Sequence, residues 1–544
     1  MNLLPDGAAV RCRKALARLE SDNAVSRIWA CDGSFWKAEA VARKQIEGAL
    51  GWLTIPDRIA PTLPELRAFV EQARAGCERV VVLGMGGSSL APYVFSRTFG
   101  PRTGYPTVEV LDSTEPSAVE ATAARSDPGR TLFIVSSKSG TTLEPNIFFD
   151  YFFDHATSEL GGKAGERFVV ITDPGSKLER EAAARRVRRV FAGDPQIGGR
   201  YSALSNFGLV PAAFLGVDVQ VLVDRARTMA EACRAAGNVN PGLLLGAALG
   251  AEALAGRDKL TFSIGPPADR FGMWLEQLIA ESTGKEGKGI LPVEGETLAG
   301  PEVYGGDRFF VRYDTEGRTD AAAEARIGSL AEHGHTAASL ILKDPLDLGA
   351  EMFRWEFATA VAGQVLGINP FDQPNVQEAK DRTTAILSGP SQLAGKDAAA
   401  GIDEEGLAQL LASIRPGDYF AITAYLDDTP ETEEILQSIR IQVRTVKRVA
   451  TTVGYGPRFL HSTGQFHKGG PATGVFLQIT RTPAAEASIP GRPWSFAQVV
   501  AAQADGDLAS LQSRGRRVLR AGVGRDVLAG LRELAAAVHR ALRG

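Results

Sequence analysis

Short apolar runs separated by stretches of helical length recur through the first half of the chain. Parallel strands that are buried on both faces read as continuous apolar runs, and strand–helix–strand units repeat at this spacing. The pattern therefore predicts a doubly wound α/β domain over residues 61–225. The expected strands are Val80–Leu83, Val108–Leu111, Leu132–Val135, Phe168–Ile171 and Val187–Phe191.

A second series of apolar runs predicts a second α/β domain over residues 226–494, with a flexible stretch near 389–406 that is rich in small and charged residues. Residues 431–446 place apolar side chains on one helical face, and Thr429-Pro430 is a good helix start. The expected strands are Leu260–Ile264, Phe309–Tyr313, Ala338–Leu342, Tyr419–Ala424 and Val475–Ile479.

The two ends of the chain lack this alternation of strands and helices. Residues 1–60 predict a helical segment with Trp29, Trp36 and Trp52 as packing anchors, and residues 495–544 predict a tail of two helices around the strand-like 517–523. At 544 residues the chain is too long for one hydrophobic core, which agrees with several domains.

Composition and charge narrow the function classes. The chain is 44% hydrophobic and 23% charged with a net charge of −4, which gives no reason to expect nucleic acid or a membrane surface as partner. Its 4 cysteines form no CxxC or zinc spacing, and the N-terminus lacks the apolar core of a signal peptide. We therefore expect a cytoplasmic protein.

A glycine-rich turn follows the first predicted strand. Gly84-Met85-Gly86-Gly87-Ser88-Ser89 begins like a dinucleotide fingerprint but has Ser89 where the third glycine belongs. Asp112, after the next strand, could mimic the acid that binds the ribose of NAD. A dehydrogenase is thus one interpretation, and a plain strand-to-helix turn with Ser89 as N-cap is another.

A second turn favours a phosphate ligand. Ser137-Lys138-Ser139 leads into Thr141 and Thr142, and Thr141 has capping-box spacing to Glu144. Hydroxyls, a lysine and free amides at a helix start suit an anion, although a serine-rich loop with a capped helix remains an alternative. Strands of such sheets end at one edge, so both turns should border one crevice, together with Asp173–Ser176, where Ser176 and Glu179 form another capping box. We expect the crevice to bind a phosphate monoester.

On these motifs the chain resembles the phosphoglucose isomerase family, and more narrowly the isomerase half of bifunctional transaldolase–phosphoglucose isomerase proteins. The similarity covers residues 80–380, and no transaldolase half is present. The resemblance implies two doubly wound SIS (sugar isomerase) domains with flavodoxin-like parallel sheets. It rests on Gly86-Gly87-Ser88, Ser137-Lys138-Ser139 with Thr142, Gly198–Ser202, Glu281–Lys285, and Phe371-Asp372-Gln373 with Lys380.

The resemblance also implies an activity: interconversion of glucose 6-phosphate and fructose 6-phosphate through an enediol(ate), without metal or nucleotide cofactor and commonly as a homodimer. Glu281 would be the base. Ser137, Ser139 and Thr142 of the Lys138-containing loop would hold the phosphate. The sugar would be surrounded by Gly87, Ser88, Arg200, Gln373 and Lys380.

The residues themselves leave alternatives open. Trp274, Leu278 and Glu281 share a helix face, so the carboxylate could be a buried base or a helix-end glutamate near solvent. Arg200 follows two glycines that allow close approach to a ligand, yet alone it reads as a surface arginine. Lys380 would lie two helical turns after Gln373, where a lysine usually faces solvent.

The ring-opening histidine is expected in a glycine-rich loop near the end of the second domain. Thr463-Gly464-Gln465 resembles the family's Asn-Gly-Gln before the histidine, with one residue inserted. We expect His467 to open the ring, with His461 as the second choice. His333 and His335, which flank a helix stop at Gly334, are expected to be structural.

Other functions compete with this one. A dual phosphoglucose/phosphomannose isomerase would carry the same residues, whereas a non-catalytic SIS protein that senses a phosphosugar would need neither Glu281 nor Arg200. An NAD-dependent dehydrogenase is the third alternative.

Overall fold

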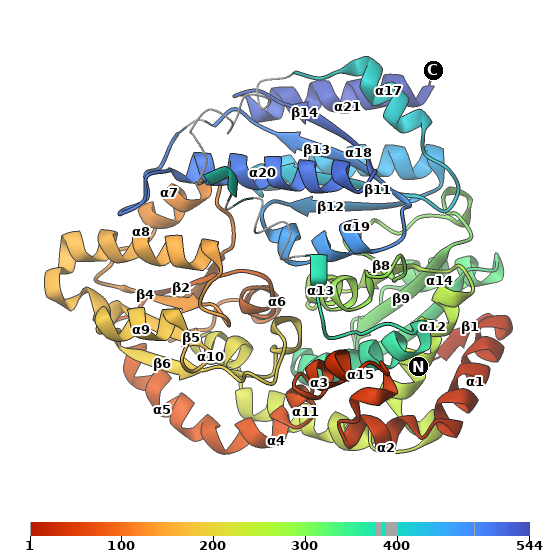
Figure 1. Ribbon diagram of the computed structural model, residues 1–544, viewed down its shortest axis with the longest axis horizontal. Helices are drawn as coiled ribbons and strands as arrows, with labels where there is room; N and C mark the ends of the chain where they lie inside the picture. Colours follow the sequence, from red (N-terminus) through yellow and green to blue (C-terminus); the bar gives the residue numbers. More distant parts are fainter. Residues whose placement is uncertain (1, 376–382, 384, 388–400, 484, 544) are drawn as a thin grey trace.

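The computed structural model describes residues 2–375, 383, 385–387, 401–483 and 485–543. Within these residues the strands form three largely parallel sheets packed with helices (Figure 1). The α/β class with parallel sheets is therefore confirmed. Apart from one N-terminal edge strand, each sheet follows the flavodoxin-like rule that the chain begins inside the sheet and reverses its direction of progress once.

The first sheet consists entirely of parallel strands. Alternate residues of its interior strand β2 face opposite cores: Val80 and Val82 pack on one face, Val81 and Leu83 on the other. The strand order is β3 (Thr107–Leu111), β2 (Arg79–Gly84), β4 (Thr131–Ser136), β5 (Phe168–Thr172) and β6 (Arg189–Ala192). The helices are α5 (Leu63–Ala73), α6 (Leu90–Phe99), α7 (Pro116–Ala124), α8 (Leu143–Leu160), α9 (Lys177–Ala184) and α10 (Asn206–Phe214).

The second sheet is parallel except for its N-terminal edge strand, which pairs antiparallel. Its order is β1 (Asn2–Leu4), β10 (Thr336–Leu342), β9 (Arg308–Thr315), β7 (Lys259–Ile264) and β8 (Leu291–Val293). Its helices include the N-terminal α1 (Asp6–Ser21), α2 (Ala24–Trp29), α3 (Ala40–Glu47) and α4 (Ile55–Ile59), followed by α11 (Val219–Ala232), α12 (Pro241–Leu254), α13 (Phe271–Thr283), α14 (Ala321–Glu332) and α15 (Leu348–Leu366).

The third sheet corrects the expected organisation. Strands predicted for one second domain are divided between two sheets, and the strand-like tail segment is an edge strand of the third. All its pairs are parallel, in the order β12 (Ala450–Tyr455), β11 (Tyr419–Tyr425), β13 (Gly474–Thr480) and β14 (Arg517–Gly522). The helices are α17 (Glu404–Ala412), α18 (Pro430–Lys447), α19 (Gly464–Gly469), α20 (Phe496–Ser513) and α21 (Val527–Arg543).

Helix starts were predicted more accurately than the grouping of strands into sheets. Helix α18 begins where predicted, with Thr429 accepting from the Thr432 amide. Of the stretch expected to be flexible, residues 389–400 lie outside the described residues, and Glu404 already starts α17. Among the described residues no helix is both long and apolar enough to cross a membrane.

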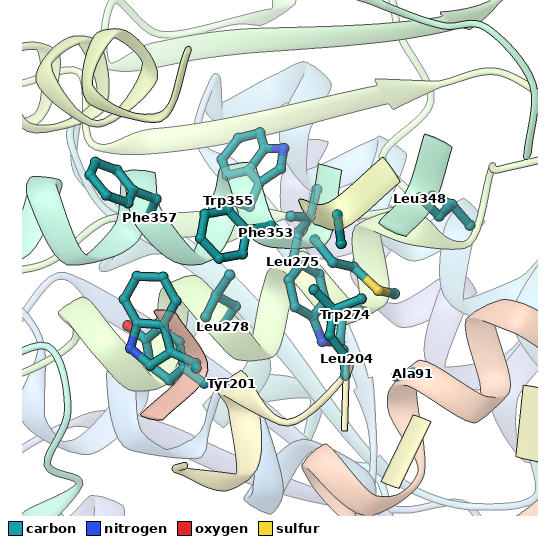
Figure 2. Close-up of a cluster of buried hydrophobic side chains, with 14 of the residues drawn as sticks. Ala91, Tyr201, Leu204, Trp274, Leu275, Leu278, Leu348, Phe353, Trp355 and Phe357 are labelled. Atoms are coloured by element: carbon teal, nitrogen blue, oxygen red, sulfur yellow. The ribbon is translucent and has the colours of Figure 1, made fainter. Parts of the chain in front are cut away.

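A hydrophobic core lies under helix α13 and joins the first two sheets (Figure 2). Trp274 and Leu278 of α13 lie among aromatic rings of α15 and Tyr201, and all are almost fully buried. Trp52, one of the predicted anchors, stacks on Tyr201 with ring centroids 5.4 Å apart. This packing fixes the residues next to Tyr201 and at the end of α13.

Candidate active site

Arg200 and Glu281 form a buried pair where connections from the first and second sheets meet. Arg200 lies in the 3-10 turn η6 (Gly199–Tyr201) after β6, and Glu281 lies in the last turn of α13 after β7. Nη1 of Arg200 is 3.6 Å from Oε2 of Glu281. Only 2% of Arg200 and 4% of Glu281 is exposed, so the solvent-facing alternatives for both residues are wrong.

The guanidinium of Arg200 is held from three other directions. Its Nε donates to Oγ of Ser282 at 2.7 Å, and Nη2 donates to the carbonyls of Pro370 at 2.8 Å and Asp372 at 3.0 Å. Buried ions need such additional hydrogen bonds to offset desolvation. The bonds leave Nη1 as the part of the guanidinium that faces Glu281.

Lys285 is a site residue to which the sequence assigned no role. Its Nζ donates to Oδ1 of Asp372 at 2.7 Å. Burial, and then the nearby Arg200 charge, lowers the pKa of Lys285 to about 8, while Asp372 and Glu281 oppose this. Arg200 and Lys285 together attach the segment before Gln373 to the site. Gln373 itself is exposed, and Lys380 lies outside the described residues.

The glycine turn after β2 packs against the two elements that carry Arg200 and Glu281, η6 and α13. A Cβ on Gly87 would lie 1.9 Å from the carbonyl oxygen of Gly199, so a side chain is excluded there. A Cβ on Gly86, whose φ is +53°, would lie 2.8 Å from Nε2 of Gln277 and 3.0 Å from the carbonyl oxygen of His461. The turn thus brings together η6, which carries Arg200, the helix α13, and the loop around His461 (residues 458–463, the 461 loop). Ser88 in this turn is buried.

Gln277 is a second residue that sequence reasoning missed. It lies one helical turn before Glu281, is 4% exposed, and its buried Oε1 has no hydrogen-bond partner in the described structure. The four-residue spacing to Glu281 was the available signal.

The predicted phosphate loop leads from β4 to the start of α8. Ser139 is exposed, the Thr142 side chain makes no capping hydrogen bond, and the buried Oγ of Ser137 has no partner in the described structure. Oγ of Ser139 also lies 3.0 Å from Oγ1 of Thr141 and accepts from the Thr141 amide. The loop therefore gathers hydroxyls at a helix N-terminus, where amides and the helix dipole favour anions.

Lys138 in this loop is bonded to Asp173; burial raises the pKa of Asp173, and Lys138 opposes that effect. One expectation about the loop needs correction. The Thr141–Glu144 capping box is absent, because Thr142 is the N-cap and Glu144 bonds elsewhere. The Ser176 cap of α9 is confirmed, with Glu179 N donating at 3.0 Å.

His461 and His467 occupy different environments. Nε2 of His461, in η10 (Arg458–His461), is 3.1 Å from Oε1 of Glu144, which sits in the first turn of α8 beside the phosphate loop. His461 is also adjacent to Gly86. The backbone and Cβ of His461 therefore border the turn that carries Gly87 and Ser88.

His467 instead lies in α19 within an aromatic core against the third sheet. Its ring centroid is 5.0 Å from that of Phe476, 6.0 Å from Tyr419 and 6.2 Å from Phe459. Both ring nitrogens are buried without a hydrogen-bond partner in the described structure. Burial, and then Lys468 and Arg516, lowers the pKa of His467 well below its ordinary value. A neutral, enclosed ring cannot reach a substrate without rearrangement.

His335 and Asp112, two further residues that the sequence singles out, both have partners that explain their positions. His335 is buried against the rings of Tyr304 and Phe310, as expected for a structural residue. Both oxygens of Asp112 accept from Arg458 at 2.9 Å, so the acid suggested for a ribose is already engaged.

A cleft of about 910 Å³ borders the 461 loop. Phe459 and Ser462 from that loop and Glu276 from α13 are among its lining residues. In the described residues no group of three or more His, Cys, Asp or Glu side chains is arranged to hold a metal ion.

Comparison with known proteins identifies the family. The family model described as phosphoglucose isomerase matches residues 58–306. The glucose-6-phosphate isomerase of Rubrobacter xylanophilus is 30% identical over 384 residues, covering 60% of this chain and 88% of the relative. That of Thermus thermophilus is 30% identical over 387 residues, covering 62% of this chain and 90% of the relative.

Solved structures are similar to this chain in fold. A hypothetical protein from Thermus thermophilus matches with a TM-score of 0.62 and 26% identity, over 71% of this chain and 100% of that one. A glucose-6-phosphate isomerase from Chlamydia trachomatis shares the fold, with a TM-score of 0.51 and 21% identity over 67% of this chain and 77% of that one. The sequence match, at this identity and coverage, is decisive: the chain belongs to the phosphoglucose isomerase family.

Proposed function

We propose that the chain interconverts glucose 6-phosphate and fructose 6-phosphate with Glu281 as the base that moves a proton between the first two sugar carbons. The observation that carries this proposal is the buried Arg200–Glu281 pair, 3.6 Å apart, beside the glycine turn at the carboxyl ends of the strands. Such edges are where ligands bind in parallel α/β sheets. A protein that only senses phosphosugars has no need for this pair.

The pair supplies the two groups that the reaction requires. Removal of the proton from the second carbon leaves negative charge on an oxygen of the enediolate. Nη1 of Arg200 faces the carboxylate and can stabilise that oxygen, because its position is fixed before the reaction by the bonds of Nε and Nη2. Returning the carbon-bound proton to the first carbon, with transfer of the hydroxyl proton from the oxygen of the second carbon to that of the first, completes the isomerisation.

We assign ring opening to His461 rather than to His467. Opening a cyclic sugar requires a proton to leave the first hydroxyl and another to reach the ring oxygen. The contact of His461 Nε2 with Glu144 leaves Nδ1 for this task, whereas both nitrogens of His467 are enclosed. His461 also adjoins the glycine turn, as a sugar-contacting group must.

The phosphate is assigned to Ser137, Ser139 and Thr142 with the amides at the start of α8. In this proposal Lys138 shapes the loop through Asp173 and acts on the phosphate only at a distance. Gly87, Ser88, Gln373 and Lys380 stay predictions as sugar contacts, and the homodimer and cytoplasmic location stay predictions as well.

A coupled assay tests the proposal. The purified chain should convert fructose 6-phosphate to glucose 6-phosphate, and Glu281→Gln should lower turnover by about 10²-fold or more while retaining sugar-phosphate binding. Glu115→Gln, the same change at a buried glutamate outside the site, should retain turnover. Sugar-phosphate binding without turnover by the unmodified chain would favour the sensor alternative, and turnover of mannose 6-phosphate would identify a dual isomerase.

A further inference from the structure

The C-terminal segment from residue 495 extends into the active site through one residue of α20. This helix packs on the third sheet at β14 and also on the first-sheet layer, where Phe496 stacks on Phe148 of α8 with centroids 5.9 Å apart. In Figure 1 one end of α20 lies above α7, and most of the helix runs alongside the strands of the third sheet. Its middle lies close to the first turn of α8, which carries Glu144.

Gln503 of α20 bonds to the carboxylate that holds His461. Its Nε2 donates to Oε1 of Glu144 at 2.7 Å, and Oγ1 of Thr114 donates to its Oε1 at 2.7 Å. Gln503 is 2% exposed and Glu144 is 5% exposed. The opposite amide orientation would set Oε1 of Gln503 against the carboxylate of Glu144, so Glu144 fixes the amide with Nε2 toward it, and the Thr114 hydroxyl, which can donate or accept, donates to the other end.

We propose that Gln503 is a positioning residue for ring opening, acting through Glu144 on His461. This rests on the function proposed above. The amide hydrogen bond favours the ionised form of a buried carboxylate, because it replaces water that burial has removed. An ionised Glu144 accepts the Nε2–H of His461 and so fixes the imidazole tautomer that presents an unprotonated Nδ1 to the sugar.

The first test is kinetic. Gln503→Met removes both hydrogen-bonding ends with little change in shape, and Gln512→Met makes the same change at an exposed position of the same helix. We expect Gln503→Met to lower kcat for the cyclic sugar by about 10- to 100-fold, the value of a hydrogen bond to a charged group, with KM nearly unchanged. Gln512→Met should match the unmodified chain. Equal turnover of the two variants would overturn the proposal.

Dependence on His461 separates positioning from general destabilisation. If Gln503 acts through His461, the double variant Gln503→Met/His461→Ala should be no slower than His461→Ala alone. Losses that multiply would show that Gln503 acts by another route and would overturn the proposal. Gln503→Glu adds a pH signature: its carboxyl can donate to Glu144 only when protonated, so its activity should recover toward acid pH.

A spectroscopic test does not depend on turnover. The ¹⁵N shifts of the His461 imidazole should report protonated Nε2 in the unmodified chain and a mixture of tautomers in Gln503→Met. Unchanged shifts would overturn the positioning role. If instead the shifts change while His461→Ala retains full activity, then the assignment of His461 to ring opening has failed, whereas the link from Gln503 to His461 stands.

Discussion

Nε2 of His461 lies 3.1 Å from Oε1 of Glu144, although the two residues are 317 positions apart in the chain. Glu144 belongs to the first turn of α8, directly after the phosphate loop, whereas His461 follows a strand of the third sheet. The contact therefore sets the imidazole at a defined place relative to the loop that would hold the phosphate.

Separate substitution of His461 and His467 gives the first prediction. His461→Ala should lower kcat for the cyclic sugar by about 10²-fold, because general acid–base catalysis contributes at least this much. Proton exchange on an open-chain substrate analogue should be largely retained, since that step needs no ring opening.

His467→Phe is the matched comparison. It keeps an aromatic ring among Tyr419, Phe459 and Phe476 and should retain turnover in both assays. Full activity of His461→Ala together with a loss in His467→Phe would return the assignment to His467.

Removal of the base gives the second prediction. Glu281→Gln should lower kcat by about 10²- to 10⁴-fold, because the amide cannot accept the carbon-bound proton. Sugar-phosphate affinity, measured by calorimetry, should stay within a few-fold of the original. Near-normal turnover of this variant is incompatible with Glu281 as the base.

The phosphate loop gives the third prediction. Ser139→Ala and Thr142→Ala should each raise KM about tenfold with a smaller change in kcat, since these contacts serve ground state and transition state alike. Inhibition by inorganic phosphate should weaken in parallel. Stability should change little, because the Thr142 side chain makes no capping hydrogen bond. A loss confined to kcat would assign the loop another task.

Glu115 gives a prediction about pH and stability. Burial raises its pKa from 4.5 to about 8, an effect that Arg481 opposes and Asp427 reinforces. The folded chain therefore retains a proton between pH 4.5 and 8 that the unfolded chain releases, so this group's contribution to the free energy of unfolding falls as pH rises through that window.

Glu115→Gln removes this titration. Its stability relative to the unmodified chain should increase from pH 5 to pH 8, by at most about 1.4 kcal/mol per pH unit, in urea denaturation. As a contrast, Glu296→Gln breaks a buried ion pair with Arg308 at 3.0 Å and should destabilise the chain at pH 8. A pH-independent difference at Glu115 would contradict the prediction.

Local sequence patterns predicted the elements well and their grouping poorly. The run at residues 80–83 is a fully buried strand, and Thr429 caps its helix, because burial and capping depend on neighbouring residues. The three-residue strands β1 and β8 are too short to give a pattern. The assignment of β14 to the third sheet depends on pairing with a distant strand, which apolar periodicity does not encode.

In the candidate site, too, the sequence predicted local features and missed contacts between distant segments. Glu281 was assigned as the base from the family resemblance, whereas the helix face that it shares with Trp274 and Leu278 left burial and exposure both open. The choice between His461 and His467 depends on tertiary packing: His461 ends the short turn η10, whereas the six-residue helix α19 turns the His467 ring into the aromatic residues of the third sheet. Gln503 gave no signal, since its partner Glu144 is 359 positions away.

The distribution of the site over the fold has a consequence for refolding. Arg200, Glu281 and His461 lie on connections that leave the first, second and third sheets, respectively. A refolding chain can therefore acquire all its secondary structure and still lack a working site. Recovery of turnover should lag behind recovery of the far-ultraviolet circular dichroism signal, and the lag measures the docking of the three layers.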